Sequence, residues 1–151
     1  MAVYYLETSA LVKLYVLEPG TDWLLRLVNA RSGDRFAVLA VSPVEARSAI
    51  RRRERAGDID SKTANLILDR LRRHMETTFL VQTLTNSVLD AALEIIDRYA
   101  LRAYDAIQLA GCLALTTAGS AERPVFVCAD RHLLEAAQSE LLSVCDPCDP
   151  N

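Results

Sequence analysis

The sequence predicts an α/β fold in which a mostly parallel sheet carries helices on both faces. Short apolar runs rich in aromatic and branched residues alternate with longer segments of helical periodicity. The apolar runs lack the polar alternation of half-exposed strands, which is typical of parallel strands buried on both sides. Strands that alternate with helices favour right-handed crossover connections and therefore a parallel sheet.

Four runs are predicted as strands, and a fifth segment is ambiguous. The four are VYYL (3–6), FAVLAV (36–41), VFVCA (125–129) and, with a weaker pattern, LLSVC (141–145). The segment TFLVQTL (78–84) is compatible with either a strand or an extended connection.

The helices between these runs are bounded by capping residues and helix breakers. Pro19-Gly20 ends the first helix, and Ser42-Pro43 places a serine cap and a proline in the first turn of the third. The predicted helices are 9–17, a segment from Thr21 to near Gly33, 42–56, a segment from Asp58 or Ser61 to Glu76, a segment that Thr85 opens, 104–115, and RHLLEAAQSE capped by Asp130.

The composition is that of one globular domain, which we place at residues 1–142 with a C-terminal tail at 143–151. Half of the 151 residues are hydrophobic and a quarter are charged. A chain of this length buries about two-thirds of its unfolded surface. The net charge of −3 gives no sign of a generally basic, nucleic-acid-binding surface, although a local basic face can exist on a protein whose net charge is negative. No membrane span and no secretory signal are evident, so we expect a cytoplasmic protein.

The four cysteines indicate neither disulfides nor a metal site. Cys112 and Cys128 lie in apolar contexts and are predicted as small core residues. Cys145 and Cys148 form a C-x-x-C pair in the tail, but no second pair or nearby histidine completes a zinc site. We interpret them as incidental thiols of a solvated tail.

Four acidic residues stand where strands end or helices begin. Glu7 follows the first strand, Asp130 follows VFVCA, Glu45 lies in the helical turn after the second strand, and Asp105 opens an otherwise apolar helix. Because the carboxyl ends of parallel strands share one edge of the sheet, we expect these side chains to converge there. Taken singly, each has an ordinary explanation as a helix cap or a first-turn residue that complements the helix dipole.

A converging set of carboxylates needs shared protons or a bound cation to relieve its repulsion. Mg²⁺ and Mn²⁺ prefer oxygen ligands, and such ions support phosphodiester hydrolysis by positioning water and stabilising charge on the leaving oxygen. Phospho-acceptor domains also place acids at strand ends. Receiver domains need a pair of acids at the end of the first strand, and haloacid-dehalogenase-type phosphatases need D-x-D-x-[ST]. The segments ETS (7–9) and ADRH (129–132) fit neither pattern.

Four segments, in their order and spacing, resemble the PIN-domain ribonucleases, especially the VapC-type toxins of bacterial toxin–antitoxin pairs. These segments are YYLETSALVKLYVLEPG, VSPVEARSAI, LRAYDAIQLAGCLAL and VFVCADRHLLEAA, and the resemblance covers essentially the whole chain. It implies a Rossmann-like α/β/α sandwich with four acids around Mg²⁺ or Mn²⁺. Carried over by motif, the four acids are Glu7, Glu45, Asp105 and Asp130.

The resemblance also implies roles and partners. Ser9 matches the hydroxyl that helps to hold a carboxylate or a metal-bound water. The substrate would be single-stranded or structured RNA, the protein would form homodimers, and a small antitoxin protein would inhibit the site. The family normally has aspartate where this chain has Glu7. The extra methylene moves the carboxylate by roughly 1.5 Å, so the backbone compensates, the ion is the larger Mn²⁺, or activity is weakened. The alternative function is therefore a PIN-like module that binds RNA or a partner without efficient turnover.

A basic helical segment follows the second predicted strand. Its arginines are either a solvated face or contacts for RNA phosphates beyond the acidic centre. The candidate RNA-binding residues are Arg47, Arg51, Arg52 and Arg55, with Arg53 beside them. His132 lies close to Asp130 but is a peripheral contact at most, because metal-activated water needs no histidine.

Overall fold

The computed structural model describes residues 1–30, 32–117 and 122–150, and it confirms the predicted α/β class. Five strands form one sheet in the order β3-β2-β1-β4-β5, and every pairing is parallel. The ambiguous segment TFLVQTL contains a strand, and the weak pattern LLSVC does as well. The strands are β1 (Val3–Leu6), β2 (Arg35–Leu39), β3 (Leu80–Gln82), β4 (Val125–Val127) and β5 (Ser143–Cys145).

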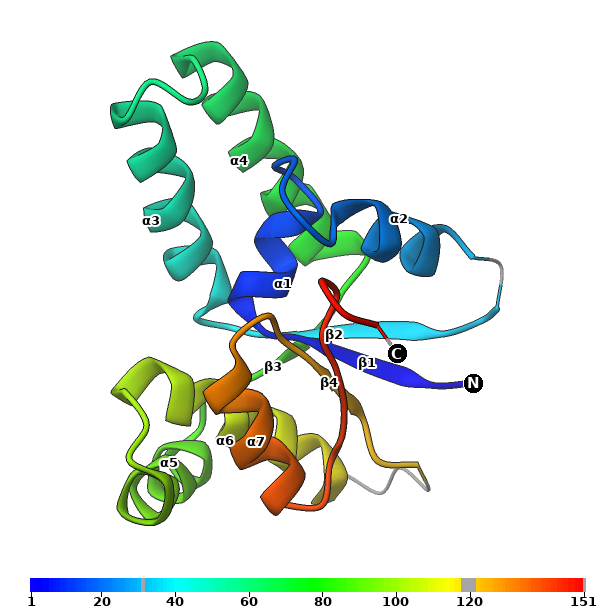
Figure 1. Ribbon diagram of the computed structural model, residues 1–151, viewed down its shortest axis with the longest axis vertical. Coiled ribbons are helices and arrows are strands. Elements are labelled where there is room, and N and C mark those ends of the chain that lie inside the picture. Colours follow the sequence, from blue (N-terminus) through cyan, green and yellow to red (C-terminus); the bar gives the residue numbers. More distant parts are fainter. Residues whose placement is uncertain (31, 118–121, 151) are drawn as a thin grey trace.

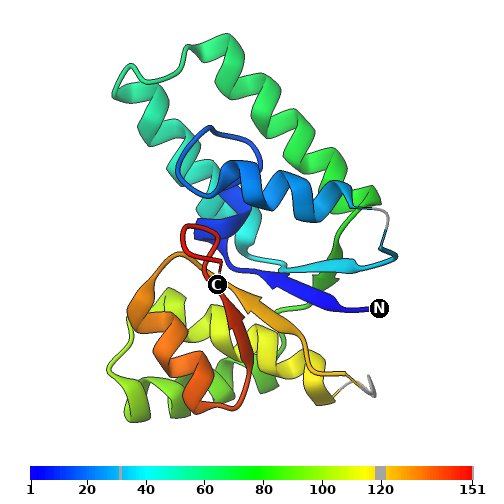
Figure 2. The same ribbon diagram turned by 45° about the vertical axis from the view of Figure 1, so that its right-hand side comes forward.

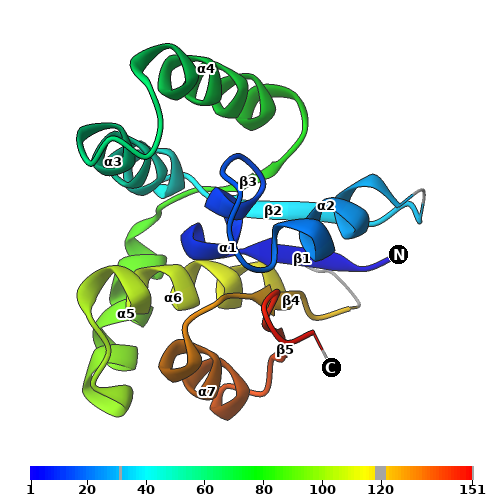
Figure 3. The ribbon, with the colours of Figure 1, turned by 45° about the horizontal axis from the view of Figure 1, so that its top comes forward.

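Helices cover both faces of the sheet, with α1 to α4 on one side and α5 to α7 on the other (Figure 1). Figure 3 shows the sheet between these two layers. The pair α3–α4 extends away from the sheet as a helical hairpin, which is clearest in Figure 2. The helices are α1 (Thr8–Lys13), α2 (Thr21–Asn29), α3 (Ser42–Arg55), α4 (Ser61–Thr77), α5 (Asn86–Tyr99), α6 (Ala103–Thr117) and α7 (Arg131–Ser139).

The central strand β1 separates two hydrophobic cores. Tyr5 belongs to the core beneath α5, α6 and α7, where its ring stacks on Phe126 with 5.7 Å between centroids. Leu6 belongs to the opposite core beneath α1 to α4. Successive side chains of a strand point to opposite faces, so both must be buried when helices cover both faces. Cys112 and Cys128 are buried in the first core, as predicted.

Helix α6 packs directly on Leu39 and Tyr5 of the sheet at Gly111, which has no side chain. A methyl group on Gly111 would stand 2.7 Å from Leu39 Cδ1 and 2.8 Å from the Tyr5 hydroxyl, closer than real contacts allow. The close approach brings the polar face of α6 within hydrogen-bonding reach of the residues at the ends of β1 and β2.

Several helix boundaries differ from the predicted ones: α2 ends at Asn29 rather than near Gly33, and α6 runs from Ala103 to Thr117 rather than over 104–115. Three others have a visible physical reason. The first helix ends at Lys13, short of residue 17, because the following turn is held by Thr21, whose hydroxyl donates to the carbonyls of Lys13 and Val16. Helix α4 is capped by Asp60, whose carboxylate accepts from the Thr63 N–H at 2.7 Å. The predicted cap Ser42 was wrong, since Val41 precedes the helix and Ser42 is its first residue.

The strand order creates a topological switch point between β1 and β4. The chain continues from β1 to β2 on one side, whereas β4 and β5 lie on the other. Ligands of open parallel sheets bind outside the carboxyl ends of the strands at such a point. Glu7 begins directly at this edge, and its N–H donates to the carbonyl of Val127 in β4 at 3.0 Å.

The C-terminal residues fold back onto the turn between α1 and α2. Strand β5 extends the sheet into the segment that we predicted as a tail. Beyond it, a Cβ at Gly20, whose φ is +93°, would lie 2.9 Å from Pro147 Cβ, and the Cys148 thiol donates to the carbonyl of Pro19. Within the described residues, no helix is long and apolar enough to cross a membrane.

Candidate functional site

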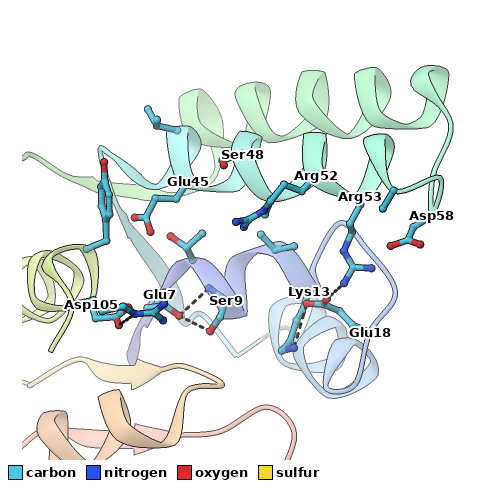
Figure 4. A pocket seen from close by; sticks show the side chains of 17 residues that line it. Glu7, Ser9, Lys13, Glu18, Glu45, Ser48, Arg52, Arg53, Asp58 and Asp105 are labelled. Carbon is cyan, nitrogen blue, oxygen red and sulfur yellow. Dashed lines mark hydrogen bonds and ion pairs between the residues drawn. The ribbon is translucent and has the colours of Figure 1, made fainter.

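A cavity of about 860 Å³ opens at the carboxyl edge of the sheet. Its walls come from α1 and the turn after it, one side of α3, and the first turn of α6. Figure 4 shows Glu7, Glu45 and Asp105 toward one end of the cavity and Lys13, Glu18 and Arg53 toward the other, with Arg52 between them. The predicted residues Glu7, Ser9, Glu45 and Asp105 therefore line one cavity although they are far apart in the sequence.

The carboxylate of Glu7 is turned back toward helix α1. Its Oε2 accepts hydrogen bonds from the Ser9 N–H at 2.9 Å and from the Ser9 hydroxyl at 2.5 Å, so Glu7 caps the helix. The side chain is buried, and burial raises the pKa of Glu7, with the hydrogen bonds from Ser9 opposing that rise. The longer glutamate chain thus folds onto the helix terminus.

Ser9 joins the ends of the two strands at the switch point. While its hydroxyl donates to Glu7, the same oxygen accepts from the N–H of Ala129 at 3.1 Å, two residues after β4. Ser9 therefore fixes the position of the Glu7 carboxylate relative to the β4–α7 connection.

Glu45 lies in the first turn of α3 and is partly buried. Burial raises its pKa, and the negative charge of Asp105 adds to the rise, whereas hydrogen bonds from Gln108 and Thr8 lower it. Asp105 itself lies in the first turn of α6 and forms an ion pair with Arg102, at 3.3 Å between Nε and Oδ2. The two carboxylates face the same cavity from different helices.

Gln108 is a buried polar residue that the sequence analysis missed. Its amide nitrogen lies within hydrogen-bonding distance of Thr8 Oγ1 (3.0 Å), Ser42 Oγ (3.1 Å) and Glu45 Oε1 (2.8 Å). Its carbonyl oxygen accepts from the Tyr5 hydroxyl at 2.9 Å. One side chain thus ties together β1, α1, α3 and α6. The signal was a single glutamine, one turn after Asp105, in an otherwise apolar helix.

Asp130 lies outside the cavity lining. Its Oδ1 accepts from the Leu133 N–H at 3.0 Å, so it caps helix α7. Asp130 is connected to the cavity through the backbone, because the N–H of its neighbour Ala129 donates to the hydroxyl of Ser9, which lines the cavity. The structure therefore brings three of the four predicted acids into one cavity and gives the fourth the ordinary capping role. His132 is exposed and does not line the cavity.

The basic residues of α3 divide into two groups. Arg52 and Arg53 line the cavity, whereas Arg47, Arg51 and Arg55 do not. Arg51 instead bonds to Glu54 at 2.7 Å and to Asn65 at 2.8 Å, which ties α3 to α4. Among the predicted RNA contacts, Arg52 is therefore the one that faces the candidate site.

The chemistry of the cavity fits a divalent cation. Its carboxylates are hard oxygen donors, and Glu7 and Glu45 each carry a pKa raised mainly by burial and further by a neighbouring carboxylate. A positive charge would relieve both effects. In the described part of the chain, however, no three acidic, histidine or cysteine side chains stand close enough together to hold an ion.

Comparison with known proteins identifies the family. The PIN-domain family model matches residues 4–139, and the chain belongs to the PIN-domain family. PIN domains are typically nucleases and generally use divalent metal ions. The resemblance that the sequence motifs indicated is thereby confirmed. Comparison with curated proteins gives no significant match.

Solved structures share the fold. PAE2754 from Pyrobaculum aerophilum has a TM-score of 0.67 and 23% identity over 97% of this chain and 84% of that chain. FitAB bound to a DNA fragment has a TM-score of 0.69 and 15% identity over 99% of this chain and 97% of that chain. VapBC2 from Rickettsia felis, bound to a DNA fragment from its promoter, has a TM-score of 0.63 and 11% identity over 95% of this chain and 98% of that chain. At these identities the similarity establishes the fold.

Proposed function

We propose that this PIN-domain protein is a Mg²⁺- or Mn²⁺-dependent endoribonuclease and the toxin of a toxin–antitoxin pair. The observation that supports the proposal is the meeting of Glu7, Glu45 and Asp105 in one cavity at the switch point of the sheet. Membership of a family of nucleases supports the reaction class, and the motif resemblance supports RNA as the substrate.

The proposed metal ligands are Glu7, Glu45 and Asp105, with Asp130 as the fourth ligand that the motif implies. When bound, the ion would supply positive charge for the phosphate and would make water more acidic. The protein's own residues hold the carboxylates in place. Ser9 orients Glu7, and Gln108, buried on α6, orients Glu45. Because no three of these side chains stand close enough to hold an ion in the described part of the chain, the carboxylates would have to move toward the ion as it binds.

A second candidate function is a binding module with little or no turnover. The Glu7 carboxylate, which replaces the usual aspartate, is buried and bonded to Ser9 rather than directed at the other acids. In this alternative the protein would bind RNA or a partner through the same cavity. Glu7→Asp separates the two candidates, because the shorter carboxylate would raise cleavage strongly only if Glu7 suppresses it.

The decisive experiment measures cleavage of RNA by the purified chain with Mg²⁺ or Mn²⁺ and with a chelator. Asp105→Asn should abolish the cleavage, because it removes one carboxylate of the cavity while keeping its shape. Asp22→Asn is the matched control, since Asp22 is an exposed acid in the first turn of α2 and outside the cavity. Cleavage that survives Asp105→Asn, or that ignores the chelator, would contradict the proposal.

The proposed partners are an antitoxin protein and a second copy of this chain in a homodimer. The structural neighbours FitAB and VapBC2 are described as bound to DNA, which suits a toxin–antitoxin complex. Size-exclusion chromatography with light scattering would test the homodimer. A cytoplasmic location is part of the same proposal, because the RNA substrate and antitoxin would be there.

A further inference from the structure

Tyr104 stands apart from the other tyrosines of the chain. Tyr4 and Tyr5 stack on phenylalanines, Tyr15 bonds to His74, and Tyr99 bonds to Glu140. Within the described residues, Tyr104 alone among the five tyrosines has neither a ring contact nor a hydrogen bond. It is 56% exposed, the only aromatic side chain among the exposed large hydrophobic residues of that part of the chain.

The position of Tyr104 is equally specific. It precedes the predicted ligand Asp105, and its side chain lines the same cavity. Val44, the neighbour of Glu45, lines the cavity as well and is 65% exposed. Each of these acids is thus accompanied by an exposed apolar side chain. Exposed aromatic and aliphatic surface beside the acids of the cavity provides a flat face for an apolar part of the ligand.

Arg52 is the second group whose bonding capacity is unused. Lys13 and Arg53 both pair with Glu18, and Arg102 pairs with Asp105. The guanidinium of Arg52 lines the same cavity but, within the described residues, has no carboxylate or hydrogen-bonding partner. Figure 4 shows it on α3 between the acids and the Lys13–Glu18–Arg53 group. A guanidinium without a partner beside an acidic centre suits a phosphate group.

We propose that the cavity binds an unpaired nucleotide of a single-stranded RNA, with its base on the Tyr104 ring and Val44 and a phosphate at Arg52. This inference rests on the proposed function and names the side chains of that site that would contact the base and the phosphate of the strand. Proteins bind single strands by combining aromatic rings, on which bases stack, with cations along the backbone. A duplex keeps its base faces covered, so a paired base cannot use Tyr104 in this way.

The test measures binding rather than cleavage. All variants carry Asp105→Asn to prevent turnover, and fluorescence anisotropy reports binding of a fluorescein-labelled ten-nucleotide uridine RNA in Mg²⁺. Tyr104→Ala should weaken binding roughly 5- to 150-fold, the range found for loss of one base-stacking ring. Tyr104→Phe keeps the ring and should bind like the parent. Leu66→Ala is the control, because Leu66 is 61% exposed on α4 and does not line the cavity.

A second probe separates the base from the phosphate. On an abasic strand of equal length, Tyr104→Ala should have no effect, whereas Arg52→Ala should weaken binding of both strands. Arg52→Ala should also reduce the slope of log K against log salt by about 0.7, the contribution of one phosphate contact in a single strand. The inference is overturned if Tyr104→Ala matches Leu66→Ala, or if it weakens the abasic strand equally; Tyr104 would then serve a protein partner.

This experiment can fail independently of the nuclease proposal. If the chain without Asp105→Asn cleaves RNA and Tyr104→Ala leaves binding unchanged, the nuclease proposal stands and the stacking role falls. If RNA binding depends on Tyr104 but no cleavage occurs with either ion, the stacking role stands and the binding module replaces the nuclease.

Discussion

Replacement of Gln108 tests whether one buried amide holds the candidate site together. Gln108→Leu keeps a similar volume at a fully buried position but removes the carbonyl that accepts from Tyr5 and the amide that donates toward Glu45. The Tyr5 hydroxyl and the Ser42 hydroxyl are both buried and lose the partner that the wild-type chain gives them. The substitution therefore leaves polar atoms unsatisfied in the core.

The size of the effect follows from these two hydroxyls. Leaving a buried polar group without a partner costs about 1–3 kcal/mol, and the better burial of leucine offsets part of this loss. We expect the free energy of unfolding to fall by about 2–4 kcal/mol. At about 2–4 °C per kcal/mol for a chain of this size, the melting temperature should drop by about 4–16 °C. The pKa of Glu45 should rise further, because the hydrogen bond from Gln108 lowers it.

Thermal unfolding by circular dichroism measures the stability, and carbon-detected NMR titration follows the Glu45 carboxyl group. Gln138→Leu makes the same chemical change on the exposed face of α7 and should be nearly neutral. Adding Tyr5→Phe to Gln108→Leu should recover part of the loss, because it removes one of the unsatisfied hydroxyls. If Gln108→Leu is as stable as Gln138→Leu, or if Tyr5→Phe gives no recovery, Gln108 does not organise the site.

Three further predictions concern neighbouring residues. Glu7→Gln should raise the melting temperature of the metal-free protein at pH 7, because burial raises the folded-state pKa of Glu7 and disfavours its charged form. The wild-type chain is destabilised as the pH rises through the raised pKa of Glu7 and its carboxyl group ionises, so the advantage of Glu7→Gln in melting temperature should vanish toward about pH 4. An advantage that does not change with pH in a series of melting curves would refute burial of the charge as its cause. Gly111→Ala should lower the free energy of unfolding by about 1–2 kcal/mol, because overpacking against Leu39 and Tyr5 outweighs the better helix propensity of alanine, and chemical denaturation measures the difference. Asp130→Ala should lower the free energy of unfolding by about 1 kcal/mol, because it removes the cap of α7. Asp130→Asn should keep the cap and the stability but lower RNA cleavage. Unchanged cleavage by Asp130→Asn would mean that Asp130 only caps the helix.

The fold could be predicted from the sequence because its strands are apolar on both faces and its helices carry clear caps. Thr85 and Asp130 cap α5 and α7 as expected. The first helix and the cap of α3 were predicted less well, because long-range bonds override local signals there. The hydroxyl of Ser42 accepts from Gln108, far away in the sequence, instead of capping α3, and that bond is invisible to a local pattern.

The site was predictable only in part. Glu7, Glu45 and Asp105 could be assigned to one edge because their positions follow from parallel strands and the helices after them. That Glu7 turns back onto Ser9 depends on the side-chain torsions of a longer acid, and no spacing rule predicts it. Gln108 was missed because a lone glutamine in an apolar helix gives no sign of its partners, which come from three other elements.

The absence of a side chain at Gly111 has a consequence beyond packing. Gly111 touches none of the acids, yet the narrow gap that it permits determines whether the amide of Gln108 reaches the second wall of the cavity. A methyl group added at Gly111 would push α6 away from the sheet. Tyr104 and Asp105, the two residues that α6 contributes to the cavity, would then move relative to α1 and α3. Variants at this remote position should therefore resemble active-site variants in any test of the proposed RNA binding and cleavage, while their carboxylates stay chemically intact.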